Sequence, residues 1–328
     1  MKEYGIITLK EDVEILEGFL YQPTLLEVFY PETVTEIAGI CFKHCEKLHN
    51  FTISENITTI GNQAFSDCYS LTEIVVPETV ETFNQFIFQE CHNLKKAVIN
   101  AQITELPYNT FYHCYVLDDL TLPDTLETIG EYSLIGCAFK TFIVPENVKN
   151  IRSYAFQNCP NLEEIIFNEK LEIINTGIWW GCSNLKRVDF SNTKLLTTFT
   201  DFRDCVNLEY VHLPLPSAYE KTNSIFSDCE NLKTVVFGNG TETIIQNILY
   251  GNHSVENVII PSSVKTIETN AFSGCLKIKH IELPDELEVI KTNAFNGCSG
   301  LEEIIIPASV KEVGSSAFWS NNQVCKKI

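Results

Sequence analysis

Large apolar side chains recur along the chain with a period of about 23 residues. In one copy of the pattern, Phe65 stands three residues before Cys68, and Leu71 stands three residues after it. The next copy begins at Phe88, and the same order continues almost to the end of the chain. A period of roughly 20–29 residues is typical of repeat architectures in which each unit buries its apolar side against its neighbours.

The position occupied by Cys68, here called the Cys position, recurs thirteen times and holds cysteine eleven times and asparagine twice. A small inward side chain that can form a hydrogen bond explains both residue types. The odd total of thirteen cysteines also fits poorly with complete pairing in disulfides. We therefore expect free, buried thiols. The positions are Cys45, Cys68, Cys91, Cys114, Cys137, Cys159, Cys182, Cys205, Cys229, Asn252, Cys275, Cys298 and Asn321.

A three-residue apolar strand follows each Cys position, as at residues 74–76 and 304–306. Proline often ends the strand, and a second apolar pair such as Val264 and Ile267 comes next. The pattern predicts an α/β-type leucine-rich-repeat solenoid, a right-handed superhelix with a parallel sheet on its concave face. The convex side is expected to hold short turns and β structure, with low helix content.

The first and third strand residues should point into the core and the middle one outward. Many middle residues are nevertheless apolar. Two explanations remain open: the preference of branched side chains for strands, or an exposed strip that binds a partner. The middle residues are Phe29, Thr52, Val75, Val98, Thr121, Ile143, Ile166, Asp189, His212, Val236, Ile259, Glu282 and Ile305.

The chain shows no linker, so a single solenoid is expected over residues 1–328. Residues 1–22 are expected to form a degenerate N-terminal capping unit, with the first regular strand at 28–30. About thirteen repeats of 22–24 residues fill 23–324, and 325–328 form a tail.

The segment 260–275 reads I-P-S-S-V-K-T-I-E-T-N-A-F-S-G-C. It closely resembles the BspA-like class of leucine-rich repeats, whose pattern is I-x-[IL]-P, then V-x-x-I, then A-F-x-x-C. The resemblance covers about residues 28–324. Members occur in bacteria and anaerobic protozoan parasites, and several are surface proteins that bind host matrix proteins or other cells. The resemblance thus implies a surface or secreted adhesion protein whose partner is a matrix protein or another cell's surface protein.

Charge and hydropathy narrow the choice of partner. The formal net charge of −20 opposes binding to nucleic acid or to an anionic membrane. No apolar run reaches about 18 residues, so no transmembrane helix is expected. Residues 1–20 lack the basic start and uninterrupted apolar core of a secretory signal. This observation and the free thiols favour an alternative, a cytosolic leucine-rich-repeat scaffold or regulatory subunit.

Two groups of residues were considered for chemistry. Cys41, His44, Cys45 and His49 are the best metal candidate, but Cys45 already belongs to the repeat. Zinc sites also usually contain paired C-x₂₋₄-C elements. Cys91-His92 and His113-Cys114 suggest a nucleophile with its base, but sequence neighbours rarely form such a dyad. The sequence also has no phosphate loop or hydrolase motif. We therefore expect no enzyme activity, no cofactor and no metal.

Binding to a protein partner is expected on the concave face near the middle of the array, where outward residues change from apolar to polar. The position three residues before the Cys position, held by Phe65 and Phe88 in two repeats, is called the Phe position. Aromatic residues one position after it are further candidates, because aromatic side chains are enriched in interface hot spots. The strand at 304–306 looks uncapped, which predicts end-to-end self-association through 301–328 or a continuation of the repeats. The candidate partner-binding residues are Ile143, Ile166, Asp189, Tyr210, His212, Trp180 and Tyr250.

Overall fold

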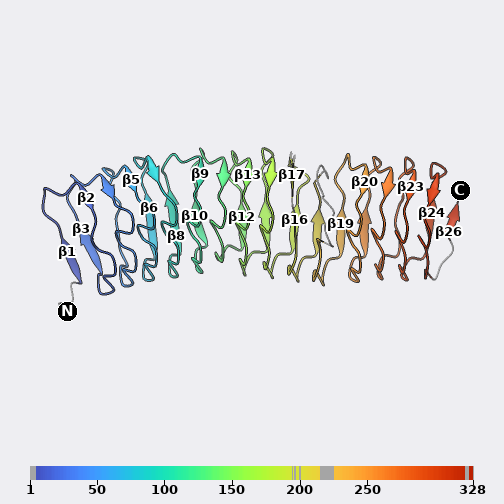
Figure 1. Cartoon of the computed structure of the whole chain (residues 1–328), viewed down its shortest axis with the longest axis horizontal. Coiled ribbons are helices and arrows are strands. Elements are labelled where there is room, and N and C mark those ends of the chain that lie inside the picture. Colours follow the sequence, from blue (N-terminus) through green and yellow to red (C-terminus); the bar gives the residue numbers. More distant parts are fainter. Residues whose placement is uncertain are drawn as a thin grey trace. The chain divides into compact units, whose positions relative to one another are not determined.

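The computed structural model describes residues 5–193, 195, 197–198, 201–214, 225–321 and 325–327. The chain divides into two compact units, unit 1 (residues 1–162) and unit 2 (residues 163–328). Within each unit, parallel strands lie side by side in two rows as a β-solenoid (Figure 1). The described residues contain no helix and so none that could cross a membrane, and the predicted low helix content is confirmed.

Unit 1 has one row of strands of three or four residues, here called long strands, and one row of two-residue short strands. Its long strands are β1 (Ile6–Thr8), β3 (Glu27–Phe29), β6 (Glu73–Val76), β8 (Lys96–Ile99), β10 (Asp119–Thr121) and β12 (Thr141–Ile143). Its short strands are β2 (Ile15–Leu16), β4 (Glu36–Ile37), β5 (Thr59–Ile60), β7 (Thr82–Phe83), β9 (Glu105–Leu106), β11 (Thr128–Ile129) and β13 (Asn150–Ile151).

Unit 2 repeats this arrangement. Its long strands are β14 (Glu164–Ile166), β16 (Arg187–Asp189), β18 (Tyr210–His212), β19 (Thr234–Val236), β21 (Asn257–Ile259), β24 (Ile304–Ile306) and β26 (Cys325–Lys327). Its short strands are β15 (Ile173–Ile174), β17 (Thr197–Thr198), β20 (Thr243–Ile244), β22 (Thr266–Ile267), β23 (Val289–Ile290) and β25 (Glu312–Val313).

The long strands alternate inward and outward side chains, as predicted. On β6, Ile74 is 2% exposed and Val76 is fully buried, whereas Val75 between them is 52% exposed. Ile143 on β12 is 68% exposed and Ile259 on β21 is 54% exposed. The outward apolar residues expected from the sequence therefore do face solvent, and they form a feature of the long-strand face.

The Phe position supplies most of the core between turns. In unit 1 the rings of Phe42, Phe65, Phe88 and Phe111 stack, with successive centroids 5.3, 5.6 and 5.5 Å apart. All four side chains are fully buried. Such stacking adds to the free energy gained by burying each ring. Unit 2 contains equivalent stacks, Trp179 with Phe202 and Phe272 with Phe295, each at 5.1 Å.

Thiols at the Cys position connect one turn to the turn before it. The Cys114 thiol donates a hydrogen bond to the Phe88 carbonyl oxygen at 3.2 Å, and the pattern recurs in both units. The twelve described cysteines are buried and free, which confirms the expectation from their spacing. Burial raises the pKa of the Cys45 thiol to about 12, so this thiol stays protonated at neutral pH.

In most of the turns that the structure describes, two residues adopt positive φ, which explains the asparagine and glycine of the N-A-F-S-G-C segment at 270–275. Asn270 has φ of 57° and Gly274 has φ of 79°. Asparagine and glycine tolerate this left-handed conformation better than other residues do.

Three details differ from the expectations. Residues 28–30 are not the first strand, because β1 pairs in parallel with β3 one turn earlier, without the Phe and Cys motif that marks later turns. The strand 304–306 is not an open edge, because β26 pairs with β24. The self-association that rested on this open edge stays a prediction, which light scattering over a concentration series can test.

The third difference is that residues 51–53 and 281–283 form no strand. At residues 51–53, the Tyr30 hydroxyl bonds to backbone groups that would otherwise pair with a neighbouring strand. It accepts a hydrogen bond from the Ser54 N–H at 3.0 Å and donates one to the Thr52 carbonyl oxygen at 2.7 Å. At the second break, a single bridge between His280 and Glu303 remains.

Candidate partner-binding site

Four outward side chains meet on strands β16 and β18 of unit 2. The parallel register places Arg187 opposite Tyr210 and Asp189 opposite His212. The Arg187 guanidinium lies 2.5 Å from an Asp189 carboxylate oxygen and 3.9 Å above the centre of the Tyr210 ring. Asp189 also lies 3.6 Å from Nδ1 of His212. We call these four residues the Arg187 cluster.

The repeat itself brings these residues together. On each of the two strands a buried valine, Val188 or Val211, separates two outward side chains, because strand side chains alternate between the faces. One repeat later the same two positions recur on the next strand. They lie directly opposite the first two, close enough for their side chains to interact as cross-strand pairs. The cluster is therefore fixed by register, while its chemistry depends on four residues that differ from those of most other repeats.

The cluster shifts two pKa values. Partial burial raises the pKa of Asp189, but hydrogen bonds from Ser191 and the Arg187 charge together lower it by more than burial raises it. The pKa of Asp189 therefore lies below its usual value. Partial burial lowers the pKa of His212, Asp189 opposes this effect, and Arg187 adds to it. At neutral pH the cluster thus holds a charged Arg187–Asp189 pair beside a neutral imidazole.

The surroundings of the cluster resemble the composition of protein interfaces. Ile166 on β14 is 46% exposed and Ile259 on β21 is 54% exposed, so apolar surface belongs to the same long-strand row. The ion pair between Lys186 and Glu163 measures 2.8 Å, with Lys186 exposed and Glu163 half-buried. A centre rich in tyrosine and arginine, with apolar neighbours and a charged rim, is typical of binding hot spots.

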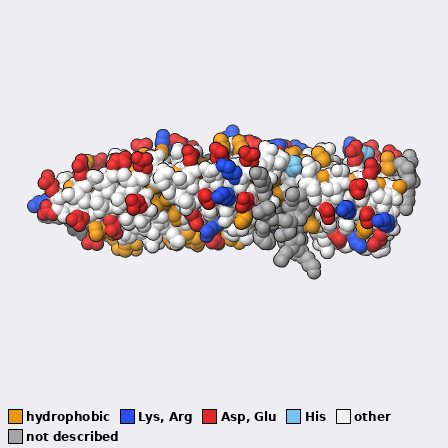
Figure 2. Space-filling model, turned by 90° about the horizontal axis from the view of Figure 1, so that it is seen from above, with side chains coloured by type: hydrophobic (Ala, Val, Ile, Leu, Met, Phe, Trp, Pro, Cys, Tyr) orange, Lys and Arg blue, Asp and Glu red, His pale blue; other side chains and the backbone are white. Residues whose placement is uncertain are grey.

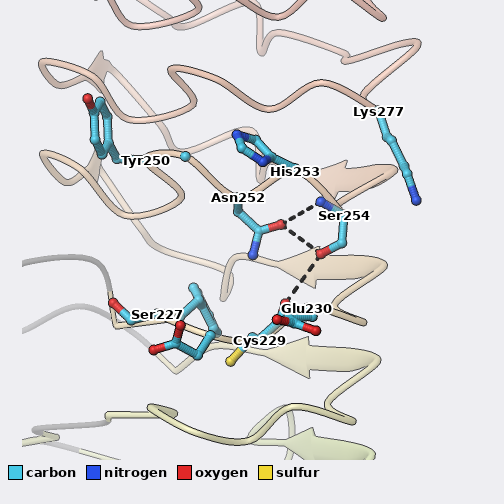
Figure 3. Close-up of a pocket in the computed structure, with 11 residues that line it drawn as sticks. Ser227, Cys229, Glu230, Tyr250, Asn252, His253, Ser254 and Lys277 are labelled. Atoms are coloured by element: carbon cyan, nitrogen blue, oxygen red, sulfur yellow. Dashed lines mark hydrogen bonds between the residues drawn. The ribbon is translucent and has the colours of Figure 1, made fainter.

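The other candidate residues lie elsewhere. Ile143 belongs to β12 of unit 1, where it is 68% exposed, more than any other large apolar residue of the described long strands. Trp180 belongs to a turn of unit 2, and its indole N–H donates to an Asp204 carboxylate oxygen at 2.6 Å. Tyr250 belongs to another turn of unit 2 and lines a pocket (Figure 3). The structure thus joins Asp189, Tyr210 and His212 but places the aromatic turn residues outside the cluster.

Sequence reasoning missed Arg187, whose importance follows from its register with Tyr210. It also missed a group on the turns of unit 1, where Glu90 lies 2.8 Å from Nε2 of His92 and 2.9 Å from Nδ1 of His113. His113 follows Glu90 by one repeat of 23 residues, so aligning the residue before the Cys position in each repeat would have paired them.

The cysteines and histidines considered as metal ligands or as a nucleophile–base pair make other contacts. The Cys91 thiol is buried and donates to the Phe65 carbonyl oxygen at 3.1 Å, while His92 lies beside Glu90. His44 lies 3.7 Å from Asp67 and His49 lies 3.7 Å from Glu27. Among the residues that the structure describes, no three histidine, cysteine or acidic side chains form a metal-binding group.

Stacked short parallel strands, alternating inward and outward side chains and a core of repeated apolar positions define a leucine-rich-repeat scaffold. The chain belongs to the family described as BspA type leucine rich repeat region, whose model matches residues 5–118, 104–221 and 199–325. The resemblance read from the sequence is therefore confirmed. Comparison with curated proteins found no match.

Two solved structures have the same fold. One is a leucine-rich repeat protein from Bacteroides ovatus, with 22% identity and a TM-score of 0.54, over 100% of this chain and 93% of that chain. The other is a leucine rich cell surface protein from Faecalibacterium prausnitzii, with 24% identity and a TM-score of 0.50, over 98% of this chain and 87% of that chain. At these identities the likeness shows the fold alone.

Proposed function

We propose that the chain is an adhesion-type scaffold, on the cell surface or secreted, that binds a partner protein through the Arg187 cluster. The observation that carries this proposal is the Arg187–Tyr210 contact of 3.9 Å beside Asp189 and His212. This contact places a tyrosine and an arginine together on a face whose other outward side chains are mostly shorter and partly apolar. Ile143 on the long-strand row of unit 1, and Trp180 and Tyr250 on the turns of unit 2, stay secondary candidates.

Charge suggests the character of the partner surface. Figure 2 shows Asp and Glu side chains spread over the face in view, whereas Lys and Arg side chains gather in a few places. Unit 1 has 22 acidic and 9 basic residues, and unit 2 has 21 and 14. Such a field favours encounter with a basic protein surface and disfavours nucleic acid.

The test of the binding site uses two double variants. Binding to a panel of purified extracellular-matrix proteins is measured for Tyr210→Ala/His212→Ala and for the matched control Asp119→Ala/Thr121→Ala on β10. We expect at least about a 30-fold loss of affinity for the first variant, since hot-spot truncation costs about 2 kcal/mol or more. Its melting temperature should not change. Equal losses in both variants would contradict the proposal, and loss only on replacing Trp180 and Tyr250 moves the site to the turns.

Location is tested separately. The family and the F. prausnitzii cell surface protein support a surface position. The alternative, a cytosolic scaffold or regulatory subunit, is supported by the free thiols, because reducing compartments keep cysteines unpaired. Surface biotin labelling of intact cells, followed by fractionation, distinguishes them: labelled chain supports the first, and chain labelled only after lysis supports the second.

A further inference from the structure

Two consecutive turns of unit 2 enclose a pocket of about 340 Å³. One turn carries Phe226 and Asp228, and the next carries Tyr250 and Asn252 (Figure 3). Lys277, from the turn that follows, completes the lining. The volume lies at the small end of the usual range for small-molecule sites, roughly 300–1,000 Å³.

The pocket lies where the backbone bonds between turns are missing. In most other described turns, the residue before the Cys position donates its N–H to the next turn, as Glu90 does to the Tyr112 carbonyl oxygen at 2.7 Å. Gly251 does the same to Ser273 at 2.8 Å. Within the described part of the chain, the N–H of Asp228 makes no such bond to Tyr250. The next-turn bond from the N–H of Phe226 is also absent from this part of the chain.

Asn252 occupies the Cys position at this opening. A thiol there would donate to the carbonyl of the preceding turn, as Cys275 does to Leu249 at 3.4 Å. Asn252 instead uses its Oδ1 within its own turn, accepting hydrogen bonds from the Ser254 N–H at 3.1 Å and the Val255 N–H at 3.0 Å. The asparagine thus stabilises its own turn and leaves the preceding turn without its usual thiol donor.

The amide nitrogen of Asn252 is left for a ligand. The side chain is only 8% exposed, and its Nδ2 has no hydrogen-bond partner among the described residues. Figure 3 shows this nitrogen directed toward the turn that carries Cys229, while the oxygen bonds to Ser254. A ligand acceptor at this nitrogen would form a hydrogen bond that no described protein group supplies.

The lining then defines the ligand. Donors are Nδ2 of Asn252 and the free N–H of Asp228; acceptors are the carboxylates of Asp228 and Glu230. Tyr250, 55% exposed, adds an aromatic ring. Two carboxylates against one Lys277 ammonium repel anions. We propose that this pocket binds a neutral monosaccharide unit of a glycan. Sugar hydroxyls both donate and accept hydrogen bonds, and the C–H face of a sugar packs against an aromatic ring.

The test is saturation-transfer NMR and calorimetry with glucose, galactose, mannose and N-acetylglucosamine as probes. Two variants change the pocket: Asn252→Cys restores the repeat residue, and Tyr250→Ser removes the ring. Trp319→Ser is the matched control, since Trp319 follows Phe318 as Tyr250 follows Leu249 and is 67% exposed. We expect at least one sugar to bind, and each pocket variant to weaken it by about tenfold or more, the loss expected for one hydrogen bond or stacking contact.

The control should bind the sugar as the wild type does, and glucuronate should bind more weakly than glucose because it is an anion. Binding of no sugar in the panel, or equal binding by the wild type and Asn252→Cys, would overturn the proposal. Binding of arginine methyl ester without binding of any sugar would also overturn it, and would assign the pocket to cationic side chains. Asn252→Cys should not alter binding of a matrix protein through the Arg187 cluster, so the two proposals fail independently.

Discussion

Two pairs of consecutive turns, one in each unit, are built from the same repeat but differ in structure. In unit 1, the turn of Phe88 packs on the next turn through stacked rings 5.5 Å apart, and the Cys114 thiol bonds to the Phe88 carbonyl oxygen. In unit 2, the turn of Phe226 meets Leu249 and Asn252 at the corresponding positions, and a pocket opens between the turns. Replacement of a ring and a thiol thus accompanies an open pocket at the surface between the two turns, while Phe226 and Leu249 stay buried.

The comparison separates two roles of repeat positions. Inward positions hold turns together, and each contributes only to contacts with adjacent turns, as expected for a solenoid. A changed inward position such as Asn252 alters one interface and leaves the others intact. Outward positions such as Asp189 and His212 change the surface without touching the core. Sites can therefore arise locally, one turn at a time.

The ring stack gives the largest expected effect. Phe88→Ala should destabilise the protein by about 3–5 kcal/mol, because it removes a fully buried ring and leaves a cavity. Leu249→Ala, at the same repeat position in the turn next to the pocket, should cost less, about 2–3 kcal/mol, since it removes a smaller side chain that belongs to no ring stack. Urea unfolding measures both values. An equal or larger loss for Leu249→Ala would show that the opened turns are packed as tightly as those of unit 1.

Exchanging the residue at the Cys position tests the same comparison with a smaller effect. Cys114→Asn should destabilise unit 1 by about 1–3 kcal/mol, because the buried amide leaves polar atoms unsatisfied in closely packed turns. Asn252→Cys should be neutral or stabilising, and should slow hydrogen exchange at the Asp228 amide as the turns close. Hydrogen exchange by NMR reports the second effect directly. Faster exchange at Asp228 in this variant would show that the asparagine does not cause the opening.

Much of the fold follows from the period of the sequence. The exposure of Val75 and the burial of the thiols were predicted because they depend only on repeat position. Strand β1 was not predicted, since no Phe and Cys motif precedes it. Strand β26 was not predicted because it begins at Cys325, earlier than the repeat of about 23 residues from Ile304 would place it. The interruption at 281–283 was missed because the motif is present there and predicts a strand. The backbone hydrogen bonds that define a strand depend also on the neighbouring turns, which the motif does not describe.

The candidate sites were predictable only in part. Tyr210 and His212 were found because they depart from the apolar outward pattern. Arg187 was missed because its contact with Tyr210 depends on cross-strand register, which no single repeat reveals. The pocket was missed because asparagine and cysteine were both treated as small inward residues that form one hydrogen bond, whereas the carboxamide of Asn252 has both a donor and an acceptor. Residue type at a repeat position predicts packing better than it predicts hydrogen bonding.

The smallest expected effect concerns His212, which occupies an outward position held by valine or isoleucine in several other repeats. Its pKa is lowered chiefly by partial burial, with the Asp189 carboxylate opposing that effect. An NMR titration of the imidazole should therefore give a midpoint below the value of about 6.5 for free histidine. Because protonation is disfavoured in the folded state, stability should fall as pH falls through this range. Asp189→Asn removes the opposing carboxylate and should lower the midpoint further. A midpoint at or above that of free histidine, or one that rises in Asp189→Asn, would mean that this outward position is solvated like its neighbours and that the Arg187 cluster does not act as a unit.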